Sequence, residues 1–533
     1  MIFQEEDKSY HEQSEICYIC NNNRGIKGKK DTPFSTNNPK VRDHDHLTGK
    51  YLGPAHQSCN LNKRREKPFL SIFFHNFSGY DSHLILPYLS KSYLPEIESI
   101  SIIPKTSEKF MSIKINNRVT MLDSMNFLSG GLDSLFESIK SSCSFRFIKQ
   151  SSLISVLDCR TGKYVPRTNS RERLELLLGK GVFPYEYANS IEDFDHPKLI
   201  EKKYFYNSIT RSNITDEQYE KAQTVWKTFE MGSMKDFMET YCLCDTLLLS
   251  EVFERFKDES MENFEIEPGH FISLPGFAYQ AFLKQTGVQM DYVTNADIFD
   301  MLSSNLRGGH SFASQRYEES SLFKKTSHKI DPGPQNVWKN RTEDDLQYII
   351  DIDMNNLYGC AQSFKIPKEE LVFLSNDEKE KIDWINLDPN DKYGFFVEVD
   401  LEYPKEIHEM TKSFPLCPQN SEITYNMLSP FQKGCLHNLF GKENYRQTKL
   451  TATFLPKHKI VLHGVLLSLY LKLGMKLINI HRCIRFKQDH FLREWVEFCT
   501  QKRTNSKDSF AKKFWKDMVN IVFGMCGNHS FKL

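Results

Sequence analysis

The sequence has no excess of charge of either sign. It contains 69 Lys and Arg against 69 Asp and Glu in 533 residues, so the formal net charge is zero. Composition therefore gives no overall attraction to nucleic acid, and any site for a polyanion must be local. Long apolar runs are missing too: the most apolar stretch, residues 460–473, is interrupted by His463 and Lys472 and is too short to span a bilayer.

The first residues, MIFQEEDKSYHEQ, lack the basic start and apolar core of a secretory signal. The 13 cysteines are an odd number scattered through a long chain, which indicates reduced thiols and argues against a disulfide framework. We therefore expect a nuclear or cytoplasmic protein of about two to four domains, with no membrane partner.

Two short pairs of metal-ligating residue types lie near the N-terminus. Cys17 and Cys20 form a C-x-x-C pair, and His56 and Cys59 repeat its two-residue gap. Two such pairs can close a tetrahedral zinc site, because each short loop points both ligands inward. Two pairs around the DHDH sequence at residues 43–46 are a much more specific signal than one C-x-x-C.

This stretch resembles the zinc-bound ββα-metal module of phage recombination endonuclease VII. The resemblance implies a structural Zn²⁺ ion and places Asp43, His44 and Asn60 at the positions that carry nuclease chemistry in that family. His56 stands where that family usually has Cys, and it is still a zinc ligand. Two interpretations stay open: a module that cuts DNA, or a structural module whose DHDH residues only brace the loop, which we favour.

Two further motifs each place a carboxylate four or five residues after an Asn or a Tyr. An apolar strand is predicted over residues 69–74, followed by a turn flanked by Asn76 and Asp81 and then by an amphipathic helix. Tyr241 and Asp245 are four residues apart and share one face of a second predicted helix. The two motifs resemble the second and third motifs of the 3′–5′ exonuclease domain of family B DNA polymerases, which implies an RNase-H-like fold and two-metal hydrolysis.

Ser124 and Met125 resemble the motif that grips single-stranded DNA in the protein-primed branch of the same family. The first exonuclease motif, Asp-x-Glu, does not occur between Met1 and Phe74. We therefore expect a vestigial exonuclease domain.

The sequence DIDMNNLYG, residues 351–359, follows the apolar run Tyr348–Ile350. In a predicted strand, Asp351 and Asp353 share a face, so both carboxylates would be exposed at its end. The sequence resembles the first polymerase motif, Asp-x-x-(Ser/Asn)-Leu-Tyr. The resemblance implies that Asp353 binds Mg²⁺ (or Mn²⁺), that Tyr358 lies under the incoming sugar, and that Asp351 is a neighbour of the metal site.

A basic helix with aromatic residues is predicted over residues 502–528. Lys513, Lys516, Asn520 and Phe523 fall at steps of three and four, on one stripe. Cations on such a stripe can hold a triphosphate, and a flat ring beside them can stack on a base pair. The pattern resembles the second polymerase motif, with Phe523 in place of Tyr. Upstream, Gly308 and Gly309 resemble a glycine pair that lets template DNA approach the backbone closely.

The resemblance extends from Cys17 to about Gly527 and is to protein-primed family B DNA polymerases of organellar or viral, Maverick/Polinton-like type. It implies template-directed DNA synthesis by two-metal nucleotidyl transfer, with primer–template DNA, dNTPs and a terminal priming protein as partners. The third polymerase motif, Asp-Thr-Asp, is not found after the second. We therefore expect a fragment that does not extend a primer alone. The alternatives are a nuclease that uses the zinc/DHDH module and a non-catalytic DNA-binding remnant of a mobile element.

The predicted fold class is α/β multidomain, with a small zinc-bound ββα-type module, an RNase-H-like exonuclease domain and a polymerase palm with truncated fingers. The predicted domains are a zinc module (1–66), an exonuclease-like domain (67–262), a connector (263–345), a palm with an insertion (346–500) and a fingers helix (501–533).

Overall fold

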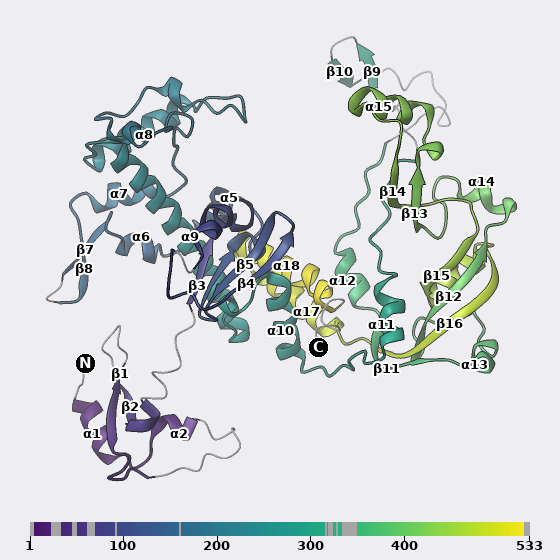
Figure 1. Ribbon diagram of the computed structural model, residues 1–533, viewed down its shortest axis with the longest axis horizontal. Helices are drawn as coiled ribbons and strands as arrows, with labels where there is room; N and C mark the ends of the chain where they lie inside the picture. The colour runs from purple at the N-terminus through teal and green to yellow at the C-terminus, as the bar shows by residue number, and fades with distance from the viewer. Residues whose placement is uncertain are drawn as a thin grey trace. The chain divides into compact units, whose positions relative to one another are not determined.

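The computed structural model describes residues 5–22, 33–44, 51–60, 70–90, 93–158, 161–314, 317, 323–326, 329–332 and 349–526. The chain forms two compact units, Met1–Gly130 and Gly131–Leu533. Both units combine helices with sheets, so the predicted α/β class is confirmed at this level (Figure 1). The predicted domain boundaries stay predictions.

The first unit begins with a small two-stranded sheet and short helices. α1 (Glu5–Gln13) and α2 (Tyr18–Asn22) precede β1 (Lys40–His44) and β2 (Tyr51–His56). The two strands are antiparallel with Asp43 opposite Gly53, and the register shifts after Asp43. Residues 57–60 are helical, so the described residues follow the order strand, strand, helix.

The second sheet of this unit has the order β3-β6-β5-β4, and only β3 and β6 are parallel. The strands are β3 (Leu70–Phe74), β4 (Ile100–Thr106), β5 (Lys109–Ile115) and β6 (Val119–Asp123). β3 confirms the strand predicted over residues 69–74. In place of the single amphipathic helix expected after it, the chain forms three short helices, η1 (Phe77–Gly79), α4 (Asp81–Ile85) and η2 (Leu86–Tyr88). Because parallel strands end at the same edge, the loops after β3 and β6 are neighbours.

The second unit is organised around one long helix. α9 (Met234–Phe264) has 31 residues and confirms the helix predicted around Tyr241 and Asp245. It begins with a capping box between Ser233 and Asp236, which satisfies backbone donors of the first turn. Before it come α5 (Leu132–Ile139), α6 (Arg146–Gln150), the hairpin β7 (Ser155–Asp158) and β8 (Lys163–Pro166), α7 (Ser170–Leu177) and α8 (Asp216–Thr228).

Three helices pack around the C-terminal half of α9 through aromatic side chains. They are α10 (Leu274–Thr286), α17 (Arg493–Asn505) and α18 (Ser509–Cys526). Phe256 contacts Phe514 with ring centroids 5.6 Å apart, and Phe264 contacts both Trp495 and Trp515 at 5.8 Å. Burial of these rings stabilises the helix cluster through apolar area removed from water.

The second unit also contains a four-stranded sheet. Its order is β11-β16-β12-β15, all antiparallel, with β11 (Ile366–Phe373), β12 (Tyr393–Glu402), β15 (Lys457–His463) and β16 (Lys476–Asp489). α16 (Gly464–Lys472) packs on β12 and β15 over a buried core that includes Val397, Val399 and Leu467. α11 (Ala296–Ser303) contacts β11. Shorter elements are β9 (Phe323–Thr326), β10 (Lys329–Pro332), α12 (Leu357–Gln362), α13 (Asn376–Glu380) and α14 (His408–Thr411).

An exposed insertion separates β12 from β15. β13 (Gln419–Thr424) and β14 (Arg446–Thr451) form an antiparallel ribbon, and α15 (Pro430–Phe440) connects them (Figure 1). No side chain of α15 is buried, and Phe431 and Leu439 are 68% and 73% exposed.

Two local predictions are wrong. The strand predicted to carry Asp351 and Asp353 is not formed. The described residues 349–354 have no regular structure and pair with no described strand. Without a neighbouring strand, the backbone groups of an extended segment gain no ladder bonds. The helix predicted over residues 502–528 is interrupted at 506–508 and divides into α17 and α18. None of the helices in the described part of the chain has the length and apolar character that a membrane-spanning helix requires.

Candidate functional site

The structure brings the four predicted zinc ligands together. The ligand atoms of Cys17, Cys20, His56 and Cys59 all lie within 4.8 Å of one another. The Cys20 sulfur is 3.3 Å from the Cys59 sulfur and 3.6 Å from His56 Nδ1. Ligands about 2.3 Å from one tetrahedral ion lie about 3.8 Å apart, so the residues present fit a zinc ion. Burial and the neighbouring thiols raise the pKa of Cys20 to about 12, so this thiol keeps its proton when no cation is bound.

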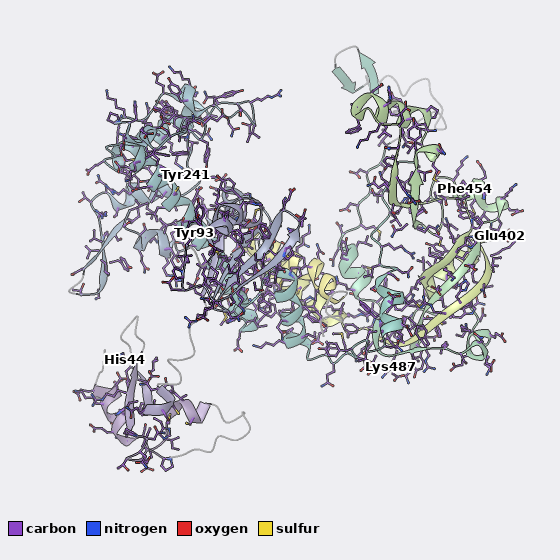
Figure 2. The ribbon with its side chains drawn as sticks, in the orientation of Figure 1. His44, Tyr93, Tyr241, Glu402, Phe454 and Lys487 are labelled. Atoms are coloured by element: carbon purple, nitrogen blue, oxygen red, sulfur yellow. The ribbon has the colours of Figure 1, made fainter. Side chains whose placement is uncertain are left out.

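The residues of the DHDH stretch are built into this module. Asp43 is buried at 4% exposure and accepts a hydrogen bond from the Tyr18 hydroxyl, which belongs to the C-x-x-C turn. Gly53, opposite Asp43, must be glycine because a Cβ there would lie 2.8 Å from the Tyr18 ring. His44 ends β1 (Figure 2), and Asn60 is buried with its Oδ1 lacking a hydrogen-bond partner among the described residues. The Tyr18–Asp43 bond is the contact expected of a residue that braces the loop.

The loops after β3 and β6 bring together the next group of predicted residues. Asn76 adopts a left-handed conformation with φ of 69°, and Gly79 lies so close to its side chain that a Cβ would be 2.8 Å from Asn76 Oδ1. The Ser124 hydroxyl is buried and 3.0 Å from His75 Nδ1. Met125 beside it is 38% exposed, so Met125 is the member of the predicted DNA-gripping pair that faces solvent.

Asp81 begins α4 at the end of the loop after β3, and it is partly buried. Burial raises its pKa above the ordinary value, and the charge of Asp123 adds to the shift. Asp123 was not identified from the sequence as a functional residue. The signal that could have found it is a carboxylate that directly ends an apolar strand and precedes Ser124.

Tyr241 and Asp245 lie in the second unit, on the N-terminal half of α9 (Figure 2). The Tyr241 hydroxyl is 2.6 Å from that of Tyr185, and the Tyr241 ring packs on Phe183. Burial, together with the Tyr185 contact and the charge of Asp245, raises the pKa of Tyr241, which therefore keeps its proton.

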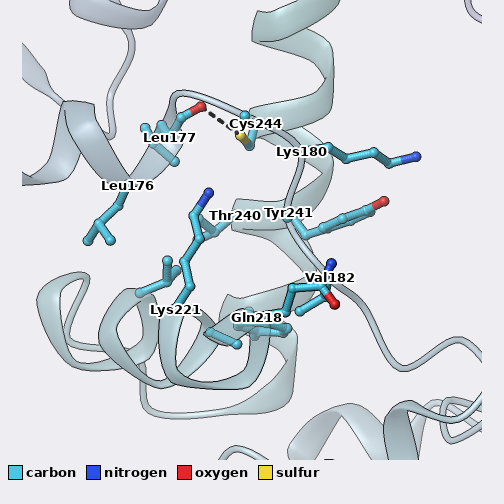
Figure 3. A pocket seen from close by; sticks show the side chains of 14 residues that line it. Leu176, Leu177, Lys180, Val182, Gln218, Lys221, Thr240, Tyr241 and Cys244 are labelled. Atoms are coloured by element: carbon cyan, nitrogen blue, oxygen red, sulfur yellow. Dashed lines mark hydrogen bonds between the residues drawn. The ribbon is translucent and has the colours of Figure 1, made fainter. Parts of the chain in front are cut away.

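The segment around residue 180 forms one wall of a pocket beside Tyr241. Figure 3 shows Lys180 extending alongside the Tyr241 ring, with Lys221 and Gln218 on the opposite wall. A Cβ at Gly181 would lie 3.2 Å from the Tyr241 ring, so this glycine permits the close packing. Cys244 faces the same pocket and donates a weak hydrogen bond to the Leu177 carbonyl, 3.6 Å away.

Asp353 precedes helix α12, and Tyr358 lies in the first turn of that helix. Asp351 and Asp353 are exposed, and Tyr358 is 55% exposed. Asn356 starts the helix in a left-handed conformation, φ 54°. Gln362 ends α12 and donates a hydrogen bond to the Val519 carbonyl on α18, 3.0 Å away. The structure therefore places the two predicted polymerase motifs side by side in one unit.

Helix α18 presents a polar face opposite its buried one. Lys513 and Lys516 are exposed and Asn520 is partly exposed, whereas Phe514, Trp515 and other residues of the opposite face are buried. Lys513 forms an ion pair with Asp517 at 2.6 Å. The stripe is thus confirmed for these three residues, and the side chain of Phe523 lies outside the described residues. Gly308 and Gly309 are exposed, with open space around both.

His490 and Arg493 contact the C-terminal end of α12, and neither residue was predicted from the sequence to do so. The Ser363 carbonyl accepts hydrogen bonds from His490 Nδ1 at 2.9 Å and from the Arg493 guanidinium at 3.0 Å and 3.2 Å. A cationic donor such as the Arg493 guanidinium at a helix C-terminus satisfies an orphan carbonyl and complements the helix dipole. No local sequence signal connects residues 363 and 493.

The class of protein follows from a comparison with known families. Residues 62–323, nearly half of the chain, match the family model of type B DNA polymerases. The model is described as DNA polymerase type B, organellar and viral, and the matched part of the chain is similar to this family.

Solved structures of Phi29 DNA polymerase are similar to the chain at low identity. The ternary complex with primer–template DNA and incoming nucleotide substrates has 13% identity and a TM-score of 0.42, covering 85% of this chain and 59% of that one. An orthorhombic crystal form has 12% identity and a TM-score of 0.43, covering 91% and 66%. The chain therefore spans less than two thirds of these structures. No curated protein sequence matches it.

Proposed function

We propose that the chain is part of a protein-primed DNA polymerase that performs template-directed DNA synthesis. The observation that carries the proposal is the family match over residues 62–323. The polymerase-like residues outside that match support it, because α12 and α18 pack together and expose Asp353, Tyr358 and Lys516 in one unit.

In this proposal the exposed face of α18 binds the nucleotide. Lys513 and Lys516 contact the triphosphate, and Asn520 and Phe523 lie beside the nascent base pair. Tyr358 restricts the space for the sugar, and Gly308 and Gly309 pass close to template DNA. The partners are primer–template DNA, dNTPs and a terminal priming protein.

The exposed Asp351 and Asp353 carboxylates fit a divalent cation, because Mg²⁺ and Mn²⁺ prefer oxygen ligands. Asp353 would hold the ion and Asp351 would contribute to the local field. When bound, such an ion neutralises charge on the triphosphate and the attacking oxygen.

The exonuclease-like residues have a DNA-contacting role in this proposal. Met125 and the exposed side of the Asn76–Asp81 loop contact single-stranded DNA, and Ser124 supports them from within. Tyr241 and Asp245, on α9 of the second unit, are the residues that resemble the third exonuclease motif. We expect no DNA hydrolysis by these residues.

Crosslinking of a labelled dNTP tests the polymerase proposal. The chain is irradiated with α-labelled dNTP, primer–template and Mg²⁺, and crosslinking should require DNA. Asp353→Asn and Lys516→Ala should each lower it at least tenfold, whereas Lys507→Ala, an exposed lysine between α17 and α18, should not. Equal crosslinking in all four proteins would contradict the proposal. Primer extension abolished by Asp353→Asn would show that the chain itself catalyses synthesis.

We infer separately that the Cys17/Cys20/His56/Cys59 cluster binds zinc in a structural role. The engagement of buried Asp43 by Tyr18 favours this over a nuclease site. The competing function is tested by DNA nicking with Mg²⁺ or Mn²⁺. Neither the wild-type chain nor His44→Ala should nick plasmid DNA, and nicking that is lost in His44→Ala would establish the nuclease.

A further inference from the structure

The carboxylate of Asp123 accepts four hydrogen bonds from the loops that follow β3 and β6. Asp123 ends β6 opposite Phe74 and is 3% exposed. Its Oδ1 accepts hydrogen bonds from the Asn76 and Met125 amides, both at 3.0 Å. Its Oδ2 accepts from the Ser78 amide at 3.0 Å and the Ser78 hydroxyl at 2.8 Å. The two oxygens of this one carboxylate thus accept four hydrogen bonds, which is the number that an ionised carboxylate can accept.

These four bonds join two separate loops. The Asn76 and Ser78 donors belong to the loop after β3, which leads to Asp81, whereas Met125 belongs to the turn η3 (Ser124–Asn126) after β6. The amides point at a single buried charge, and charge-assisted hydrogen bonds of this kind are stronger than neutral ones. The loops are thus fixed to one another from their inner side.

The outer side of the same loops remains accessible. Tyr80 and Met125 are 64% and 38% exposed, whereas Ser78 and Ser124 are buried. The exposed side chains are therefore carried by backbone that Asp123 holds in place. Asp123 itself has almost no surface with which to touch a ligand.

We propose that Asp123 is a positioning residue for single-stranded DNA binding, which holds the Asn76–Asp81 loop and the Ser124–Asn126 turn as one contact surface. The inference rests on the proposed function of these loops. A substitution of Asp123 should therefore lower the affinity for single-stranded DNA even when the variant remains folded.

The test is the affinity of the full chain for a fluorescein-labelled oligothymidylate, measured by anisotropy at 10 °C. Asp123→Asn offers one acceptor oxygen and an NH2 group facing amide donors, so affinity should fall at least tenfold. Ser78→Ala removes one of the four bonds and should cost about two- to threefold. Ile113→Val, in the buried core of the same sheet, should leave affinity unchanged although it lowers stability.

Hydrogen exchange separates positioning from a purely structural role. At 10 °C the amides of β5 should stay protected in Asp123→Asn, whereas those of Asn76, Ser78 and Met125 should exchange faster. Unchanged DNA affinity in a folded Asp123→Asn protein would overturn the inference. If that variant does not fold, unchanged affinity in Ser78→Ala would do so. No binding by the wild-type chain would instead refute the proposed function of the loops.

Discussion

Gln362 donates a hydrogen bond to the Val519 carbonyl oxygen, 3.0 Å away, and thereby joins the helix after Asp353 to the helix that carries Lys516. Gln362 is 6% exposed, and its Oε1 has no hydrogen-bond partner among the described residues. The side-chain amide of Gln362 therefore makes this contact through its nitrogen and not through its oxygen.

Replacing Gln362 with Ala should destabilise the α12–α18 contact. The variant loses the bond to Val519 and leaves a small cavity, so the free energy of unfolding should fall by about 2 kcal/mol. Gln362→Met keeps most of the volume and removes the unpaired oxygen, so its loss should be about 1 kcal/mol or less. Urea denaturation followed by tryptophan fluorescence measures both, and equal losses would contradict this account.

Two glycines in helices should respond oppositely to alanine. A Cβ at Gly359 would lie 2.4 Å from Asn356 Nδ2, so Gly359→Ala must displace the Asn356 side chain at the start of α12. Gly434 in α15 has open space around it, so Gly434→Ala should stabilise that helix by about 0.5–1 kcal/mol. Thermal unfolding should show a gain only for Gly434→Ala, and dNTP crosslinking should fall only for Gly359→Ala.

The ion pair between buried Glu398 and partly exposed Arg482 should make stability depend on pH. Two guanidinium hydrogen bonds, both 2.8 Å long, hold the pKa of Glu398 below its ordinary value of 4.5. Because the folded pKa is the lower one, the stabilisation is present above pH 4.5 and is lost as the pH falls through the folded pKa. Glu398→Gln should therefore cost about 1 kcal/mol at pH 7, and the two proteins should converge in acid.

Urea denaturation from pH 7 to pH 3 measures this difference. The matched control is Glu422→Gln, which removes the carboxylate from an exposed ion pair with Arg446 on the β13–β14 ribbon. It should change stability little at any pH, because exposed pairs contribute little. A pH-independent loss in Glu398→Gln would contradict the assignment.

Loss of one cluster ligand should unfold the N-terminal module alone. The wild-type chain should contain about one zinc ion, and His56→Ala should lose it, because the binding free energy of a structural site is also folding free energy. Elemental analysis gives the metal content, and hydrogen exchange should show lost protection in β1 and β2 but not in α9. Cys435→Ser, on α15 and outside the cluster, should retain the zinc. Zinc bound equally by both variants would refute the ligand set.

Sequence patterns predicted the features that depend on local spacing. The cluster of Cys17, Cys20, His56 and Cys59 and the helical face of Tyr241 and Asp245 follow from short intervals along the chain. The break at residues 506–508 was not predicted, although Asp508 is a favourable N-cap residue type and accepts a hydrogen bond from the Ala511 amide.

Features that depend on distant partners could not be predicted. The apolar run before Asp351 indicates an extended segment, but it does not identify a strand that would pair with it. The predicted strand was therefore wrong, because a strand forms only with a partner. The roles of Asp123 and Gln362 depend on tertiary contacts with loops and helices far away in sequence. The contact of Arg493 with Ser363 likewise joins residues that no local period relates.

The length of α9 has a consequence for how this chain can change. Tyr241 lies near one end of the helix, whereas Arg255, which pairs with Asp508 at the start of α18, and Phe256 lie towards the other. Each residue inserted between them would turn everything that follows by about 100° and advance it by about 1.5 Å. One end would then face the wrong way for its neighbours. Insertions and deletions are therefore excluded from the middle of α9, whereas the exposed loops around it can vary in length.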